Sequence, residues 1–380
     1  MSETARTQAA ASVGPWSKLY ELKIEFADDG VPNAGKIYKN GYQQIGVLLT
    51  AKPTDDQGNP LTESNSPGIT ALVRRALGLV DYKDASRLQF VQAGNTGAHW
   101  CYTDTANGFT TGSSMNTFLF STGSVDDADS DVLQFSFYVM CPPAEHAATI
   151  AIAAQADVPN PDSGGTYSVT TRGVEPNDFP KNTLSIAAVP PVRYTDLNTD
   201  LASFQAYQDP DNSETQKIVA HNHVFACREP GHEFIRFDIA PASVGEYWHV
   251  FDESTAYQNP GEAFKRYRKF NIAYAWSKSS PAQQQVFGLK DQPGSASHWW
   301  PVQVNQDDNS FYFTVAEYDT TLGGGRGFGY PGSPVNVSSP ASGGKSNVYF
   351  TVWDQFGNSG DFTPETEGLL DDFKVKPGRS

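Results

Sequence analysis

The fold class is decided by the stretch Leu133–Cys141, which reads LQFSFYVMC. Large apolar side chains recur at every second position, and this period of two is typical of a strand with one buried face. The same alternation runs through residues 20–26, 270–276, 311–315 and 348–352. Because clusters of Gly, Pro, Asn and Asp separate these segments, the sequence predicts antiparallel sheets that pack face to face.

The composition excludes several other classes of protein. Of the 380 residues, 38% are hydrophobic and 12% aromatic, so the chain can bury a core and is not disordered throughout. None of its apolar runs approaches the ~20 residues of a membrane-spanning helix. The 27 basic and 43 acidic side chains give a net charge of −16. This balance disfavours nucleic acid as a partner, because phosphates are neutralised by clustered Lys and Arg.

We expect a mainly β protein with two tandem antiparallel β-sandwich domains of immunoglobulin-like or jelly-roll-like type. The length suits two or three domains, and Pro190-Pro191 marks a boundary because proline disrupts helices and central strands. The first domain is expected over residues 18–192 and the second over residues 193–380. Residues 1–17 are expected to form a flexible N-terminal segment that lacks the apolar stretch of a signal peptide.

Two short helices are predicted as connectors between strands. The first is Ile69–Leu79, in which Leu72, Ala76 and Leu79 recur at helical spacing, and the second is Asp200–Ala206. All other segments with a clear period read as strands.

The order of segments also predicts an internal duplication. Each half of the chain has two alternating strands, a Gly-containing loop that ends in His-Trp, and a Phe-rich strand. These segments are residues 19–26, 45–51, 94–100 and 118–120 in the first half, and residues 234–239, 270–276, 294–299 and 311–315 in the second. A Ser- and Gly-rich loop then leads to a further strand in each half, at residues 133–141 and 348–353.

Two turn sequences support the sandwich architecture. Asp55–Pro60 reads DDQGNP and Asp354–Gly360 reads DQFGNSG, each directly after an alternating strand. Gly and Asn tolerate the left-handed backbone that tight turns require. Both segments resemble the D-x-x-G-N turns of bacterial immunoglobulin-like modules, and this resemblance implies a sandwich without indicating a particular family.

The richest polar cluster lies at residues 221–233 and has two interpretations. On a strand, His221 and His223 project from the same face about 7 Å apart, and Cys227 and Glu229 follow. Imidazole, thiolate and carboxylate are ligands of zinc or iron, so these four residues are a candidate metal site of a metal-dependent enzyme. The H-x-H pattern faintly resembles the cupin metal motif, but its spacing to Glu229 departs from it. The alternative is a polar strand whose histidines face solvent or bond to neighbouring loops.

Aromatic side chains at His99-Trp100 and His298-Trp299-Trp300 are candidate ligand contacts. Exposed tryptophans form platforms for a sugar or a peptide, with the histidine as a polar edge. The alternative is that each tryptophan fills the core of a sandwich, which is the commoner place for a large aromatic residue on a strand.

Three aspartates, Asp127, Asp129 and Asp131, are candidate calcium ligands because spaced carboxylates suit Ca²⁺. The EF-hand pattern fails, since Val132 stands where glycine is required and Tyr138 where glutamate is required. A solvated hairpin turn is the alternative interpretation.

Two further loops carry hypotheses. The Gly-rich segment at residues 323–332 contains Arg326, Phe328 and Tyr330, which either contact a partner or belong to a solvent-exposed excursion. The Ser- and Thr-rich stretch Phe109–Ser124 has the character of a segment that refolds into a membrane hairpin, as in a toxin-like pore former.

The function expected from the sequence is that of a non-catalytic interaction or structural protein. It would be a β-sandwich binding module or a component of a larger particle, with a protein or a glycan as partner and the capacity to form oligomers. Carbohydrate binding, metal-dependent catalysis and pore formation are the alternatives. No cofactor is expected beyond the zinc, iron or calcium named above. Without a signal peptide, synthesis is expected in the cytoplasm, with release in an assembly or by a non-classical route.

Overall fold

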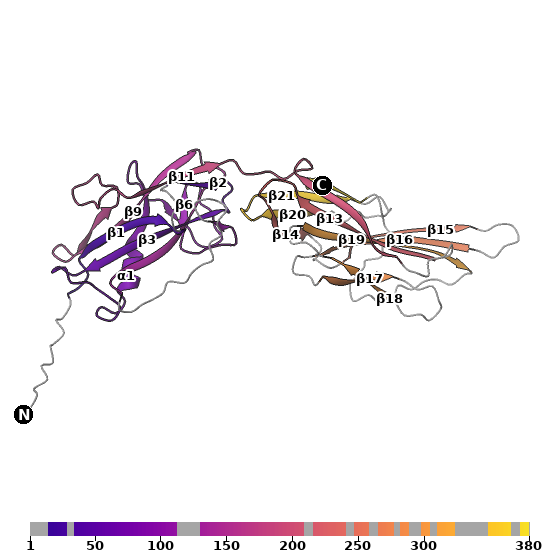
Figure 1. Ribbon diagram of the computed structural model, residues 1–380, viewed down its shortest axis with the longest axis horizontal. Helices are drawn as coiled ribbons and strands as arrows, with labels where there is room; N and C mark the ends of the chain where they lie inside the picture. The colour runs from indigo at the N-terminus through magenta and orange to yellow at the C-terminus, as the bar shows by residue number, and fades with distance from the viewer. Residues whose placement is uncertain are drawn as a thin grey trace, which may run out of the picture. The chain divides into compact units, whose positions relative to one another are not determined.

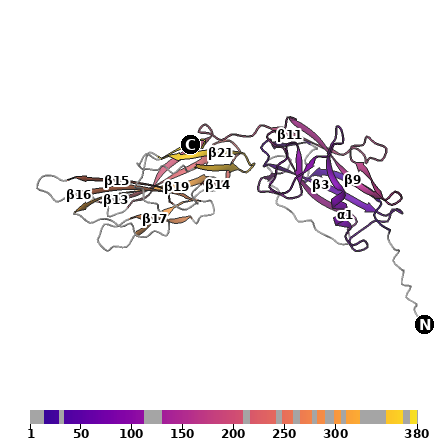
Figure 2. The same ribbon diagram turned by 180° about the vertical axis from the view of Figure 1, so that it is seen from behind.

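The computed structural model divides the chain into two compact units, Met1–Pro191 and Val192–Ser380, shown from opposite sides in Figures 1 and 2. The described residues are 14–28, 34–111, 130–208, 216–240, 247–257, 265–276, 282–288, 298–304, 310–323, 349–365 and 373–379. Their side chains are described except in residues 216–218, 247–257, 265–273, 284–288, 298–300 and 316–323. Within these ranges, no helix has both the length and the apolar character needed to cross a membrane.

The first unit contains two sheets and one short helix. Its elements are β1 (Lys18–Phe26), β2 (Ala34–Tyr38), β3 (Gln44–Thr54), α1 (Ile69–Ala76), β4 (Leu77–Asp81), β5 (Gln89–Phe90), β6 (Cys101–Thr103), β7 (Thr110–Thr111), β8 (Leu133–Met140), β9 (Thr149–Asn160), β10 (Gly165–Thr170) and β11 (Thr183–Val189). One sheet has the order β1-β3-β8-β6-β5, with β7 beside β3. The other has the order β10-β9-β11-β2, with β4 beside β9. Neighbours are antiparallel except in the pairs β2–β11, β3–β7 and β5–β6.

The two sheets of the first unit enclose a common apolar core. Ile24 on β1, Ile152 on β9 and Ile186 on β11 all lie in it, and each is at most 1% exposed. At Gly35 on β2, an added Cβ would lie 2.6 Å from Ile45 Cδ1, so the sheets approach closely where glycine stands. Side chains from both sheets meet in one buried layer, as the period-two pattern predicts.

Ordered structure begins before the first strand. Trp16 is 7% exposed and packs into the core. The Gly14 amide donates to Asp55 Oδ2 at 3.2 Å, and the Ser17 amide donates to the Thr54 carbonyl at 3.1 Å. The flexible N-terminal segment expected through residue 17 therefore does not include residues 14–17.

The second unit also contains two facing sheets. Its strands are β12 (Thr199–Gln208), β13 (Gln216–Cys227), β14 (Phe234–Ala240), β15 (Tyr247–Tyr257), β16 (Lys265–Trp276), β17 (Gln283–Gly288), β18 (His298–Gln303), β19 (Ser310–Gly323), β20 (Tyr349–Asp354), β21 (Ser359–Glu365) and β22 (Lys374–Pro377). The larger sheet has the order β12-β13-β19-β16-β15 and the smaller one β14-β20-β21-β22. The strands β17 and β18 form a separate antiparallel hairpin.

Phenylalanine rings fill the space between these two sheets. Phe225 on β13 stacks on Phe234 of β14 with ring centroids 5.8 Å apart. Phe313 on β19 lies 5.2 Å from Phe350 on β20 and 5.3 Å from Phe373. The mainly β class and its sandwich architecture, predicted from the sequence, are therefore confirmed in both units.

A buried polar chain links the opposite face of the larger sheet to the hairpin. Trp276 Nε1 donates to Thr314 Oγ1 at 2.7 Å, and the Thr314 hydroxyl donates to Asn222 Oδ1 at 2.7 Å. The Asn222 amide then donates to the Gln303 carbonyl on β18. Because each of these buried polar groups has a hydrogen-bond partner, this series of hydrogen bonds fixes the β17–β18 hairpin over that face of the larger sheet.

Both helix predictions need correction. Asp200–Ala206 lies inside β12, where backbone pairing with β13 supplies the hydrogen bonds. The first helix ends at Ala76, because Leu77 has extended backbone and starts β4. Its buried residues are Ile69 and Val73, whereas Leu72 is 51% exposed.

The pairing of strands does not support the predicted duplication. In the first unit β1 pairs with β3, and β3 pairs with β8. The segments matched to them in the second half are β14, β16 and β20. There β14 pairs with β20, and β16 lies in the other sheet. The shared rhythm of strands and loops therefore comes from the sandwich architecture and not from a common order of strands.

Candidate functional site

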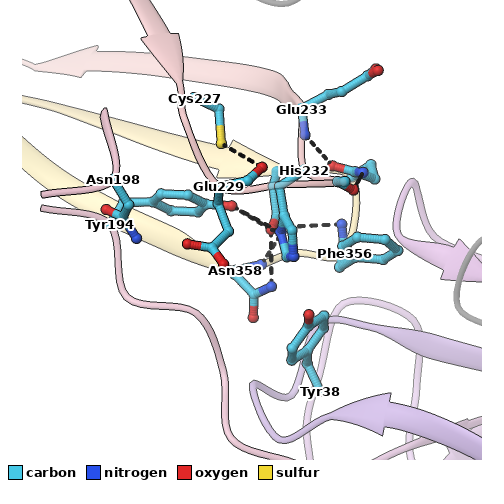
Figure 3. Close-up of polar contacts among 12 residues, drawn as sticks. Tyr38, Tyr194, Asn198, Cys227, Glu229, His232, Glu233, Phe356 and Asn358 are labelled. Carbon is cyan, nitrogen blue, oxygen red and sulfur yellow. Dashed lines mark hydrogen bonds and ion pairs between the residues drawn. The ribbon is translucent and has the colours of Figure 1, made fainter. Parts of the chain in front are cut away.

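A buried polar cluster surrounds Asp354, the last residue of β20, in the second unit (Figure 3). The chain turns here through the D-x-x-G-N sequence. Asp354 Oδ1 accepts the amides of Phe356 at 2.9 Å and Asn358 at 2.8 Å, and Oδ2 accepts the Asn358 side-chain amide at 2.9 Å. Gly357 has φ +76°, a left-handed conformation that explains glycine at this position. The carboxylate therefore holds the turn closed.

Two side chains from distant segments complete the cluster. The Tyr194 hydroxyl donates to Asp354 Oδ2 at 2.7 Å, and His232 Nδ1 lies 2.6 Å from the same oxygen. In the Nδ1–H tautomer His232 donates to this carboxylate, and Nδ1 also lies 3.1 Å from the Tyr194 hydroxyl oxygen. Tyr194 precedes β12 and His232 lies between β13 and β14, so the cluster joins the starts of two strands to the end of a third.

Burial controls the protonation of this cluster. Tyr194 is 2% exposed and Asp354 is 0% exposed. Burial, followed by the negative charge of Asp354, raises the pKa of Tyr194 far above its usual value near 10.0. Both effects favour the protonated hydroxyl, the form that donates to Asp354.

Cys227 lies beside this cluster without the features of a nucleophile. Its sulfur is 4.0 Å from the carbonyl of Glu229, toward which it points in Figure 3. Burial raises the pKa of the Cys227 thiol above its usual value. Because the thiolate is the reactive form, this environment suppresses reaction.

The four predicted metal ligands do not form a centre. His221, His223 and Cys227 share one face of β13, as the alternation predicts, but a strand places Cys227 about 13 Å beyond His223. His223 is 2% exposed, and its ring packs 4.5 Å from the ring of Phe373. Within the described ranges there is no group of three or more His, Cys, Asp or Glu side chains that would hold a metal ion. Glu229 belongs to the turn that leads to His232.

Trp100 does not offer the exposed ring that the predicted platform requires. It is 5% exposed and lies in the core of the first unit, where its indole donates to the Ala147 carbonyl at 3.3 Å. His99 is exposed and lies 3.4 Å from Glu145 Oε2, which also accepts the Trp100 amide at 3.0 Å. The core alternative is therefore correct for Trp100.

Most of the other candidates lie outside the described structure. Asp131 forms an ion pair with Lys52 at 2.6 Å, whereas the structure does not describe its predicted calcium-binding companions. Those companions are Asp127 and Asp129. The described residues also exclude Arg326, Phe328, Tyr330 and residues 112–124. The backbone of His298, Trp299 and Trp300 forms part of β18, but their side chains are not described.

The first unit contains a second copy of the Asp354 turn. Asp55 Oδ1 accepts the amides of Gln57 at 3.0 Å and Asn59 at 2.8 Å, and Oδ2 accepts the Asn59 side-chain amide at 2.9 Å. Gly58 has φ +85°. The same five-residue pattern therefore forms the same turn in both units, as the shared D-x-x-G-N sequence indicates.

Comparison with known proteins does not assign the chain to a family. No family model matches the sequence, and no curated protein is similar to it. A marsupial T cell receptor structure is 9% identical, with a TM-score of 0.18 over 90% of this chain and 100% of that one. The collagen-binding domain of the Erysipelothrix rhusiopathiae surface protein RspB is also 9% identical, with a TM-score of 0.12 over 96% of this chain and 94% of that one. Similarity at this level supports no inference about function.

Proposed function

We propose that this chain is an interaction or structural protein rather than an enzyme. One observation carries the proposal: the Asp354 carboxylate accepts from five donors, namely the amides of Phe356 and Asn358, the Asn358 side chain, Tyr194 and His232. A carboxylate has about four lone-pair sites. These contacts use that capacity, so the fold itself occupies this buried carboxylate.

The neighbouring groups support the same proposal. The His232 side chain is 7% exposed and directs Nδ1 at the Asp354 carboxylate, so the ring helps to hold the turn. A nucleophilic thiol needs a lowered pKa, but burial raises the pKa of Cys227. What remains for function is the surface that a rigid sandwich presents to a protein partner.

A native mass spectrum of the chain purified without chelator tests this proposal. We expect subunits that carry no stoichiometric transition metal. One zinc or iron ion per chain, lost in a His221→Ala, His223→Ala double variant, would contradict the proposal and restore the metal-dependent enzyme.

Glycan binding is a second candidate, favoured by the outer face of the smaller sheet. The Arg236 guanidinium lies 4.6 Å from the Trp353 ring, and the Arg379 guanidinium lies 4.5 Å from the Tyr349 ring. Aromatic rings beside planar donors suit the faces and hydroxyls of sugars. We expect any glycan bound on an array to be lost in Trp353→Ala and retained in a control, Ser163→Ala, at an exposed serine of the first unit, whereas wild-type protein that binds no glycan would remove this candidate.

A further inference from the structure

The strand β12 forms one edge of the larger sheet in the second unit and leaves its outer side unpaired among the described residues. Four successive residues, Ala202 to Gln205, are all exposed, and the Phe204 ring packs edge-on against Tyr312 with ring centroids 6.5 Å apart. Phe204 is 44% exposed although it lies in a strand. An uncovered edge with an exposed aromatic residue is a template for pairing with another strand.

The backbone direction along β12 identifies the groups that face outward. The Arg228 amide donates to the Asn198 carbonyl at 2.9 Å, so even-numbered residues at this end of β12 point toward β13. The Leu201 amide instead donates to the Asp200 side chain at 3.0 Å, outside the ladder. Because the direction alternates along an antiparallel strand, Ser203 and Gln205 present their amides and carbonyls at the open edge.

Five other edges of the sandwich sheets carry charged side chains, which discourage pairing. These are Lys23 on β1, Lys36 on β2, Arg236 on β14, Asp252 on β15 and Lys376 on β22. The edge β10 is uncharged but has six residues against the ten of β12. On β12 the charged residue is Asp200 near the start, which forms an ion pair with Arg228 at 3.0 Å.

The sequence of β12 is complementary to itself in one register. A β-bulge after Gln205 limits the regular part of the strand, and a two-fold axis at Ser203 pairs residues 201–205 within this part. The axis places Phe204 opposite Ala202 of a second copy, so that a small residue leaves room for the ring. It places Asp200 opposite Ala206, so no like charges face each other.

We propose that two copies of this chain associate by antiparallel pairing of their β12 strands, with Ser203 facing Ser203 across the two-fold axis. The proposal rests on the proposed function, because it names a second copy of the chain as the partner of that interaction protein. Such an interface is isologous and closes after two copies. A single added strand pair falls below the standard interface of about 1,600 Å², so the dimer is weak.

Charged side chains introduced at Ser203, on the proposed two-fold axis, test the register of the paired β12 strands. In sedimentation at 150 mM salt, we expect wild-type protein to dimerise with a dissociation constant between about 1 μM and 1 mM. Ser203→Lys alone and Ser203→Glu alone weaken dimerisation at least about tenfold, because like charges meet at the axis. An equal mixture of the two variants restores dimerisation to within about threefold of wild type, because opposite charges then meet. Ser359→Lys, an exposed serine on an inner strand, is the matched control and leaves the dimer unchanged.

A proline variant provides a second, independent test. Because the Ser203 amide points away from β13, Ser203→Pro keeps the pairing within one copy and blocks the edge. We expect a folded monomer by circular dichroism. A dimer of Ser203→Pro, a Ser203→Lys dimer as tight as wild type, or wild-type protein that stays monomeric up to about 1 mM would each overturn the proposal.

These outcomes are distinguishable from failure of the proposed function. A metal-free wild-type monomer overturns the pairing at β12 and leaves an interaction protein with a different partner, such as a foreign strand. A stoichiometric transition metal overturns the interaction protein, whatever the oligomeric state.

Discussion

Replacing Asp354 by Asn changes one oxygen of a fully buried carboxylate into an NH₂ group. In one amide orientation, the nitrogen faces the amides of Phe356 and Asn358. In the other, it faces the Asn358 side chain, the Tyr194 hydroxyl and His232. The first orientation leaves two backbone donors without an acceptor, and the second leaves at least the Asn358 side-chain amide without one, because a hydroxyl and a neutral imidazole can also accept, at a site that is 0% exposed. At about 1–3 kcal/mol for each unsatisfied donor, the free energy of unfolding should fall by about 1–6 kcal/mol.

Urea unfolding measures this loss. Because the chain has two units, the unfolding transition of each unit is fitted separately. Asp361→Asn is the matched control, since this half-exposed carboxylate pairs with Arg379 at 2.9 Å on the surface. We expect the control to lower the free energy of unfolding by less than about 1 kcal/mol. A loss below about 1 kcal/mol in Asp354→Asn, or a loss of equal size in the control, would refute the reasoning.

Three further predictions follow from single contacts. Gly360→Ala should lower the melting temperature of the second unit, because the new Cβ would lie 2.7 Å from Tyr194 Cβ and 3.0 Å from the Tyr194 carbonyl oxygen. An unchanged melting temperature would contradict this prediction. The Asn59 side-chain amide and backbone donors hold the pKa of Asp55 below its usual 3.8. This stabilisation is present above pH 3.8 and is lost as the pH falls through the lowered pKa, so Asp55→Asn should show a smaller loss of stability on acidification in urea titrations. Cys227 should react with iodoacetamide at pH 7 only after unfolding, as followed by mass spectrometry; rapid alkylation of the native protein would indicate an activated thiol.

The period-two pattern predicted the sandwich because side chains in a strand alternate between two faces whatever the partner strand. The stretch around Phe135 and Phe137 illustrates this, since both residues are buried on β8. The helix predicted at Asp200–Ala206 was wrong. This segment is short and has little periodicity, so pairing with β13 decides its structure.

The cluster at Asp354 was only half predictable from the sequence. The D-x-x-G-N turn is local, so spacing alone indicated its geometry. Tyr194 and His232 lie 160 and 122 residues away from Asp354 along the chain. No spacing rule connects residues so far apart. The available signal was general: a buried aspartate at a strand end requires donors from elsewhere in the fold.

Two of the predicted ligand residues, Trp100 and His223, lie in packed surroundings that their sequence patterns do not indicate. Sequence patterns identify residue types that suit a ligand, but exposure depends on packing across sheets. Trp100 resembles a platform residue in sequence and is a core residue in the structure. His223 resembles a metal ligand and packs against Phe373.

The central claim is that the Asp354 carboxylate is a structural part of the second unit and not a reaction centre. Amide hydrogen exchange at Phe356 and Asn358 tests it most directly, because both amides donate to this carboxylate. If the claim is right, these two turn amides exchange within about tenfold of the rate of Val352 in the neighbouring strand β20. Exchange of both amides at the rate of an open loop would contradict it.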